Sequence, residues 1–151
     1  DALAQLALRY LRAFGPARAA DLAAWSMIPA GWFANALETL PTYKDESGRV
    51  LYDVPRGPLP AADAVVPVRL LPKWDNAILG YEKSGRLLPA ELRRVVIGQN
   101  GDVPQTVLVD GYVAGTWEAG GAVEYLRQVT RTQKAEVADE LQRVRAWLSA
   151  S

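Results

Sequence analysis

The chain has 151 residues, of which 50% are hydrophobic and 23% charged, and its 17 basic and 17 acidic residues give a net charge of zero. This composition is typical of a globular protein and excludes an intrinsically disordered chain. Because there is no cysteine and no histidine, disulfides, thiolate nucleophiles and zinc sites built from Cys and His are also excluded.

The sequence gives no sign of a membrane segment, a cofactor or a metal. No apolar run approaches the roughly 20 residues of a membrane span, so we expect a cytoplasmic protein without a membrane partner. The chain begins at Asp1 with neither an initiator Met nor a basic n-region. This start predicts a piece of a longer chain, not a signal peptide. No Gly-rich phosphate loop and no metal-ligand cluster occurs, so we expect no cofactor and no metal.

The first 52 residues follow the order of a winged helix. Apolar residues recur at helical spacing over 2–14, where Asp1 is a candidate cap and Gly15-Pro16 ends the helix. Two further helices are expected over 17–25 and 29–40. Residues 43–52 then predict a hairpin around a polar, Gly-containing turn. Three helices followed by a hairpin predict a winged helix whose third helix packs over the second.

A Pro-rich stretch at residues 55–63 predicts a stiff linker. We therefore expect two domains, a winged-helix-like domain over residues 1–56 and a small β-domain over residues 57–151. The overall class is α+β.

The second domain is expected to be a small antiparallel β-barrel or sandwich. Gln99-Asn100-Gly101-Asp102 is its strongest hairpin signal, and Asp110-Gly111 predicts another tight turn. Gly115 is expected to serve a turn or close strand packing. An amphipathic helix over 134–148 is expected to close the sheet. The expected strands are residues 65–71, 93–98, 106–110, 112–117 and 122–130.

Four segments carry a resemblance to a known family. Residues 9–17 (RYLRAFGPA) and 21–26 (DLAAWS) are similar to the start of a helix-turn-helix in the large family of bacterial winged-helix DNA-binding proteins. Residues 70–81 (LLPKWDNAILGY) resemble its "LLP-x-aromatic-D" segment, and residues 107–117 (VLVDGYVAGTW) its "vlvDG-x-v-x-G-t-W" segment. The family includes DNA glycosylases that unhook interstrand crosslinks and remove bulky alkylated bases. The resemblance implies that this chain is the last winged helix and the β-barrel of such a protein.

The sequence departs from the glycosylases of this family in one respect. They use a Gln-x-Gln motif for catalysis, whereas no two glutamines lie two apart here. We therefore predict no catalytic residue in this chain and leave open whether the parent protein is an enzyme. Its glutamines are Gln5, Gln99, Gln105, Gln128, Gln133 and Gln142.

The candidate DNA contacts fall into three groups. The third helix offers one base reader, Asn35, beside the acidic Glu38. The wing and the densest basic stretch offer cations for phosphates, and Trp74 and Tyr81 lie near that stretch for stacking. The alternatives are a purely structural winged helix and ordinary surface charge. The candidate DNA-binding residues are Asn35, Lys44, Arg49, Lys73, Lys83, Arg86, Arg93 and Arg94.

Two acidic residues in the family-like segments are expected to be structural. Asp75 is a candidate helix cap, and Asp110 a turn residue that accepts backbone N–H bonds.

The sequence leaves three functions open. The first is a non-catalytic module that holds duplex DNA mainly through phosphates. The second is the DNA-holding half of a base-excision glycosylase with its catalytic segment elsewhere. The third is a scaffold without DNA binding, which the balanced charge favours: residues 1–56 carry 6 basic and 6 acidic side chains, 57–123 carry 6 and 7, and 124–151 carry 5 and 4. The sequence leaves the oligomeric state open.

Overall fold

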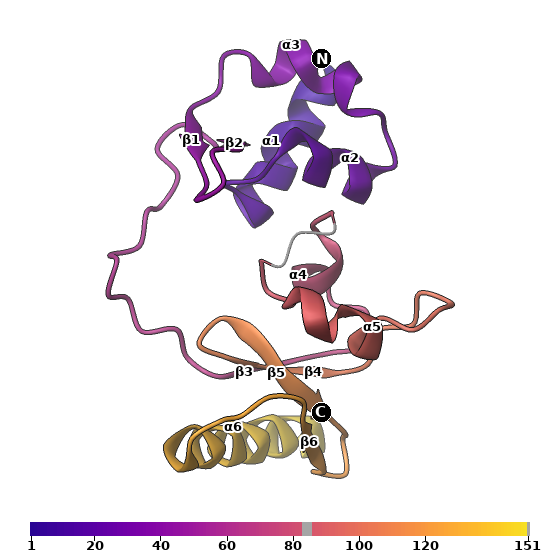
Figure 1. Cartoon of the computed structure of the whole chain (residues 1–151), viewed down its shortest axis with the longest axis vertical. Coiled ribbons are helices and arrows are strands. Elements are labelled where there is room, and N and C mark those ends of the chain that lie inside the picture. Colours follow the sequence, from indigo (N-terminus) through magenta and orange to yellow (C-terminus); the bar gives the residue numbers. More distant parts are fainter. Residues whose placement is uncertain (83–85, 151) are drawn as a thin grey trace. The chain divides into compact units, whose positions relative to one another are not determined.

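The computed structural model describes residues 1–82 and 86–150 (Figure 1). These residues form two compact units. The first contains Asp1–Ala62 and residues 79–82, and the second contains Asp63–Ile78 and residues 86–150. Within this part of the chain the mixture of helices and two antiparallel sheets confirms the α+β class. The predicted domain boundary at residue 57 stays a prediction.

The first helix, α1 (Ala2–Phe14), begins and ends where the sequence indicates. The carboxylate of Asp1 accepts a hydrogen bond from the N–H of Leu3 at 3.0 Å and caps the helix. The N–H of Gly15 bonds to the carbonyl oxygen of Leu11 at 2.8 Å and ends it. Tyr10 and Leu11 are buried on its inner face, as the apolar spacing predicts.

The next two helices are shorter than expected. α2 (Ala19–Ser26) begins two residues late, with Arg18 as its N-cap. The predicted continuous third helix is a 3₁₀ turn, η1 (Ala30–Phe33), followed by one α-helical turn, α3 (Ala34–Leu37). Gly31 lowers the helix propensity of this stretch. The combination of turns still places Phe33 and Leu37 in the core.

A two-stranded hairpin follows the helices. β1 (Thr42–Lys44) pairs with β2 (Val50–Tyr52), and Gly48 takes the positive φ of 76° that their turn requires. Tyr52 and Ala17 exchange two backbone hydrogen bonds of 2.7 and 2.9 Å, which join the hairpin to the helices. The first unit thus has the predicted order of helices and hairpin. The winged-helix assignment itself stays a prediction.

An aromatic cluster fills the core of the first unit. Tyr10 stacks at 5.2 Å on Phe14 and at 5.3 Å on Trp25, measured between ring centroids. Tyr81 meets the Phe14 ring edge-on at 6.0 Å. Tyr81 therefore belongs to this core although it lies beyond the linker in sequence.

The second unit is built on one four-stranded antiparallel sheet in the order β3-β4-β5-β6. A closed barrel is not confirmed, because β3 and β6 are the two edges of the sheet in the described residues. Its strands are β3 (Arg69–Leu71), β4 (Thr106–Val109), β5 (Tyr112–Trp117) and β6 (Val123–Tyr125).

Both faces of this sheet are covered. Val107 and Val109 pack in one apolar cluster with Val137 and Leu141 of α6 (Arg131–Ser149). Leu108, between them on β4, packs in a second cluster on the opposite face. That second cluster includes side chains of α4 (Asn76–Leu79), η2 (Ala90–Leu92) and α5 (Arg93–Val96).

The strand predicted over residues 93–98 is wrong, because residues 93–96 form α5. Val95 is 64% exposed, whereas Val96 is 1% exposed and Leu92, four residues earlier, is buried. This spacing follows a helical period. The strand was predicted because the segment is rich in valine, which is common in strands. The strand predicted over 122–130 is also too long, since only β6 forms.

The hairpin predicted at residues 99–102 is wrong, because residues 93–96 before it form a helix, whereas the turn predicted at Asp110-Gly111 is confirmed. Asp110 (φ 53°) and Gly111 (φ 78°) form the predicted two-residue turn between β4 and β5. Gly115 serves close strand packing, because a Cβ there would collide with the carbonyl oxygen of Glu124 on β6. In place of backbone N–H groups, the Asp110 carboxylate accepts a 2.7 Å bond from the side-chain amide of Gln133.

The predicted C-terminal helix is confirmed as α6. Thr130 and Gln133 form a reciprocal capping box at its start, with bonds of 3.2 and 2.8 Å. Val137 and Leu141 are buried, whereas Leu148 near the end of the helix is 47% exposed and does not join the core. Among the described residues, none of the helices combines the length and apolarity needed to cross a bilayer.

Candidate nucleic-acid interface

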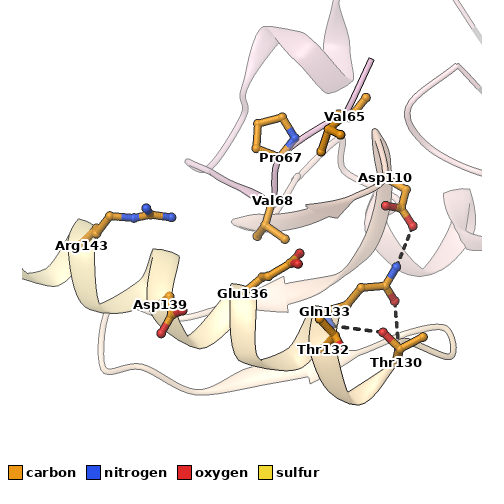
Figure 2. Close-up of a pocket in the computed structure, with 11 residues that line it drawn as sticks. Val65, Pro67, Val68, Asp110, Thr130, Thr132, Gln133, Glu136, Asp139 and Arg143 are labelled. Carbon is orange, nitrogen blue, oxygen red and sulfur yellow. Dashed lines mark hydrogen bonds between the residues drawn. The ribbon is translucent and has the colours of Figure 1, made fainter. Parts of the chain in front are cut away.

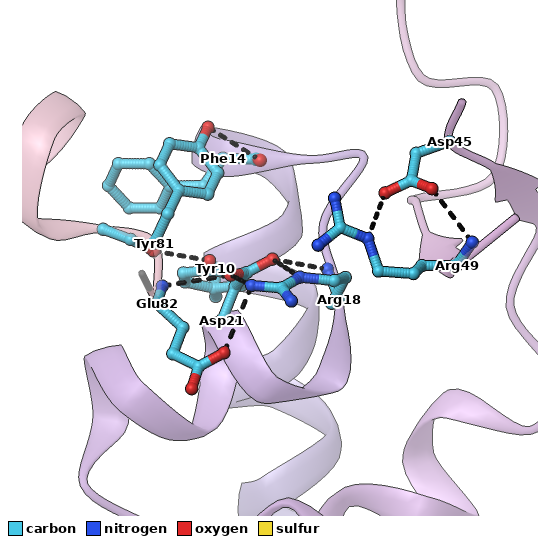
Figure 3. A network of polar contacts seen from close by, with 9 residues as sticks. Tyr10, Phe14, Arg18, Asp21, Asp45, Arg49, Tyr81 and Glu82 are labelled. Carbon is cyan, nitrogen blue, oxygen red and sulfur yellow. Dashed lines mark hydrogen bonds and ion pairs between the residues drawn. The ribbon is translucent and has the colours of Figure 1, made fainter. Parts of the chain in front are cut away.

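The predicted DNA contacts of the first unit all lie at its surface. Asn35 is exposed on α3, and Lys44 is exposed on β1. Arg49 is about half-exposed at 53%, but its Nε atom lies 2.6 Å from Oδ2 of Asp45 (Figure 3). Asp45 therefore neutralises much of the charge that Arg49 would offer to a phosphate.

Asp45 is the centre of the hairpin turn. Its carboxylate accepts the N–H groups of Ser47 and Arg49, both at 2.9 Å, as well as the Arg49 guanidinium. The Arg49 N–H, its guanidinium and the Ser47 N–H hold the pKa of Asp45 below its ordinary value. The sequence showed a polar turn here but not that Arg49 would fold back on it.

The candidates of the second unit lie on the short helices and the loop before them. Arg93 is half-buried and Arg94 is exposed on the single turn of α5. Lys73 bonds to Asp102 at 3.0 Å, and Arg86 is half-buried. Lys83 lies outside the described residues.

The two aromatic residues expected to stack near the basic stretch differ sharply in exposure and in packing. Trp74 is 56% exposed, and the ammonium of Lys73 lies 4.5 Å from the centroid of its ring. Tyr81 instead packs on Phe14 in the first unit and donates a 3.0 Å hydrogen bond to the Phe14 carbonyl oxygen. Only Trp74 is placed to meet a ligand.

A buried ionic network in the first unit was not anticipated. Asp21 is 2% exposed, and its carboxylate accepts three bonds from Arg18, of 2.7, 2.9 and 3.1 Å, and one of 3.0 Å from the N–H of Glu82 (Figure 3). The hydrogen bond to Asp21 raises the pKa of Arg18.

This network is structural. All these donors satisfy the Asp21 carboxylate, so it retains little capacity to bind a ligand. The i, i+3 spacing of Arg18 and Asp21 at the start of a helix could have indicated the ion pair between them. No sequence pattern links either residue to Glu82, 64 positions after Arg18, whose carboxylate lies 3.3 Å from the Arg18 guanidinium.

A groove of about 490 Å³ lies in the second unit, between residues 65–68 and α6 (Figure 2). The side of the groove opposite α6 is apolar and includes Val65, Pro67 and Val68. Asp110, Glu136 and Asp139 line it with one cation, Arg143, so its net charge is negative. Acidic walls repel phosphates, and this groove is therefore a poor candidate for a nucleic-acid interface.

Nearly the whole chain matches a known protein family. Residues 1–147 match the family described as "DNA glycosylase AlkZ-like". The chain therefore belongs to the AlkZ-like DNA glycosylase family, and the relation to the interstrand-crosslink glycosylases predicted from residues 70–81 and 107–117 is confirmed.

One solved structure shares the fold. It is the Streptomyces sahachiroi DNA glycosylase AlkZ, which is similar with a TM-score of 0.69 and 23% sequence identity. The match covers 93% of this chain and 43% of that chain, so this chain spans less than half the length of AlkZ. No curated protein sequence matches this chain.

Proposed function

We propose that this chain is a DNA-binding module that holds duplex DNA mainly through phosphate contacts and does not itself excise a base. The observation that carries the proposal is the family match over residues 1–147. Exposed cations supply a chemistry for it, since Lys44 on β1 and Arg94 on α5 are open to solvent. Phosphate neutralisation by such side chains supplies most non-specific DNA affinity.

The side chains of η1 and α3 give little support for base-specific reading of DNA. Asn35 is the single Asn, Gln, Lys or Arg on η1 and α3, whereas sequence readers usually present several such residues to base edges. The module is therefore proposed to bind DNA of any sequence with similar affinity.

A second candidate extends the first: the parent protein is a base-excision glycosylase, and this chain is its DNA-holding half. The 43% coverage of AlkZ favours it. The test is an excision assay on alkylated and crosslinked DNA. We expect no product from these 151 residues alone, and excision by them would contradict the non-catalytic assignment. The cytoplasmic location stays a prediction.

The DNA-holding proposal is tested by measuring the affinity for a random duplex of about 20 base pairs at several salt concentrations. We expect binding at low salt and a log K that falls linearly with log salt. A flat dependence, or no binding at low salt, would overturn the proposal and favour the scaffold. A charge reversal at Arg143, which lines the acidic groove, is the control and should leave the slope of log K against log salt unchanged.

A further inference from the structure

Trp74 holds an unusual backbone conformation at the surface of the second unit. Its φ is 57°, in the left-handed region, and its N–H donates a 3.1 Å hydrogen bond to the carbonyl oxygen of Val103. The next residue, Asp75, accepts a 2.7 Å bond from the N–H of Ala77 and caps α4. The Trp74 backbone is thus held by its own hydrogen bond to Val103 and by the helix cap at the next residue.

Neither the backbone nor the core explains an indole at this position. A bulky side chain disfavours the left-handed region, which glycine or asparagine adopts more readily. The ring is 56% exposed and is absent from the apolar clusters of the second unit. Strained residues of this kind concentrate at functional sites. The side chain is therefore best explained by what it presents to solvent.

The surroundings of the ring define the chemistry of its ligand. The Lys73 ammonium lies 4.5 Å from the ring centroid and 3.0 Å from Oδ1 of Asp102. Both members of this ion pair are about half-exposed, so Lys73 remains open to an anion. An exposed indole with a half-exposed cation over its ring suits a nucleotide, because a base stacks on the accessible part of the ring while the cation attracts the phosphate.

We propose that Trp74 and Lys73 form a stacking site for an unpaired nucleobase of DNA. The inference rests on the proposed DNA-holding function and adds a preference for a class of DNA. Inside a paired duplex the neighbouring bases cover both faces of each base, so away from the duplex ends only an unpaired base can stack on Trp74. The site therefore adds affinity for DNA with an unstacked base and none for a regular duplex.

The test compares a duplex of about 20 base pairs with the same duplex carrying one unpaired thymine, at low salt. The wild-type chain should bind the second more tightly. Loss of one base–aromatic stack corresponds to a loss of about 5- to 140-fold in affinity. Trp74→Ala should lose a factor in this range on the duplex with the unpaired base and nothing on the regular duplex, while Trp74→Phe keeps part of the preference. Trp147→Ala, which removes another exposed indole, should change neither.

Three results would overturn the inference: no preference in the wild-type chain, an unchanged preference in Trp74→Ala, or an equal loss in Trp147→Ala. Trp74→Gly guards against misfolding, since glycine accepts the positive φ. It should melt no more than a few degrees below wild type and still lose the preference.

Failure of the DNA-holding proposal is separable from failure of this inference. If the DNA-holding proposal fails, the chain does not bind the regular duplex. The stacking site is tested separately by adding single-stranded oligo(dT), which should quench the tryptophan fluorescence of the wild-type chain and quench that of Trp74→Phe much less. Equal quenching in both would also contradict the stacking site.

Discussion

The phenol oxygen of Tyr10 lies 2.6 Å from the carbonyl oxygen of Gly80 and donates a hydrogen bond to it across 70 residues of sequence. The same segment places Tyr81 against Phe14 and the N–H of Glu82 on the Asp21 carboxylate. Residues 79–82 are therefore an integral part of the first unit, and a fragment that ends at the predicted boundary lacks them.

Tyr10→Phe should destabilise the chain. Tyr10 is 1% exposed, so its loss as a donor leaves the buried Gly80 carbonyl without that partner, at a cost of about 1–3 kcal/mol. Urea unfolding followed by tryptophan fluorescence measures the change. Tyr43→Phe, at an exposed position of β1, is the matched control and should be neutral. Equal stabilities of Tyr10→Phe and wild type would contradict the importance of this contact.

Gly115→Ala should destabilise the second unit by about 1–3 kcal/mol, since the added methyl group collides with the Glu124 backbone and the strands must separate. The control is Gly120→Ala, where a Cβ meets nothing within 4 Å. Urea midpoints of the two variants give the comparison. If both variants shift equally, close packing of β5 on β6 is not the cause.

Thr106→Val should stabilise the chain. Thr106 is fully buried on β4, and its hydroxyl has no hydrogen-bond partner in the part of the chain that the structure describes. Removal of this hydroxyl relieves a desolvation penalty of about 1 kcal/mol, and valine fits a strand. Thermal unfolding should show a higher Tm. The control is Thr132→Val at the exposed start of α6, and a lower Tm in Thr106→Val would show that the hydroxyl is satisfied.

The hairpin turn should weaken in acid. The folded turn binds the carboxylate form of Asp45, so the pKa of Asp45 is lower in the folded state than its ordinary 3.8. By linkage, the stabilisation is present above that ordinary value and is lost as the pH falls through the lower folded value.

Amide chemical shifts of Ser47 and Arg49 between pH 6 and pH 2 measure this titration. We expect a midpoint below 3.8 in the wild-type chain and no such titration in Asp45→Asn. The neighbouring Glu46→Gln should leave the midpoint in place. A midpoint at or above 3.8 would show that the hydrogen bonds to Asp45 do not persist in solution.

Arg94→Ala should weaken binding to every duplex by a similar factor and reduce the slope of log K against log salt by about 1, as expected for one lost phosphate contact. Arg49→Ala should change the slope less, because Asp45 already pairs with its guanidinium. Equal slopes for Arg94→Ala and wild type would remove α5 from the proposed interface.

Local chemistry explains what the sequence determined alone. Asp1 and Gly15 bracket α1, Thr130 begins α6, and Asp110-Gly111 turns the chain between two strands. Each of these features depends on hydrogen bonds and φ preferences within a few residues, so the sequence carries the full signal. The motifs in residues 70–81 and 107–117 likewise predicted the family that the match over 1–147 confirms.

The tertiary structure decided the features that depend on distant partners. Residues 93–96 became helical because packing on β4 and β5 favours one buried face, although their valines suit a strand. Tyr81 joined the core of the first unit, where Phe14 and Asp21 lie far from it in sequence. Trp74, the other predicted stacking residue, lies at the surface, and its N–H bonds to the carbonyl oxygen of Val103, 29 residues later. These outcomes depend on contacts between segments tens of residues apart, and no local pattern in a single sequence encodes them.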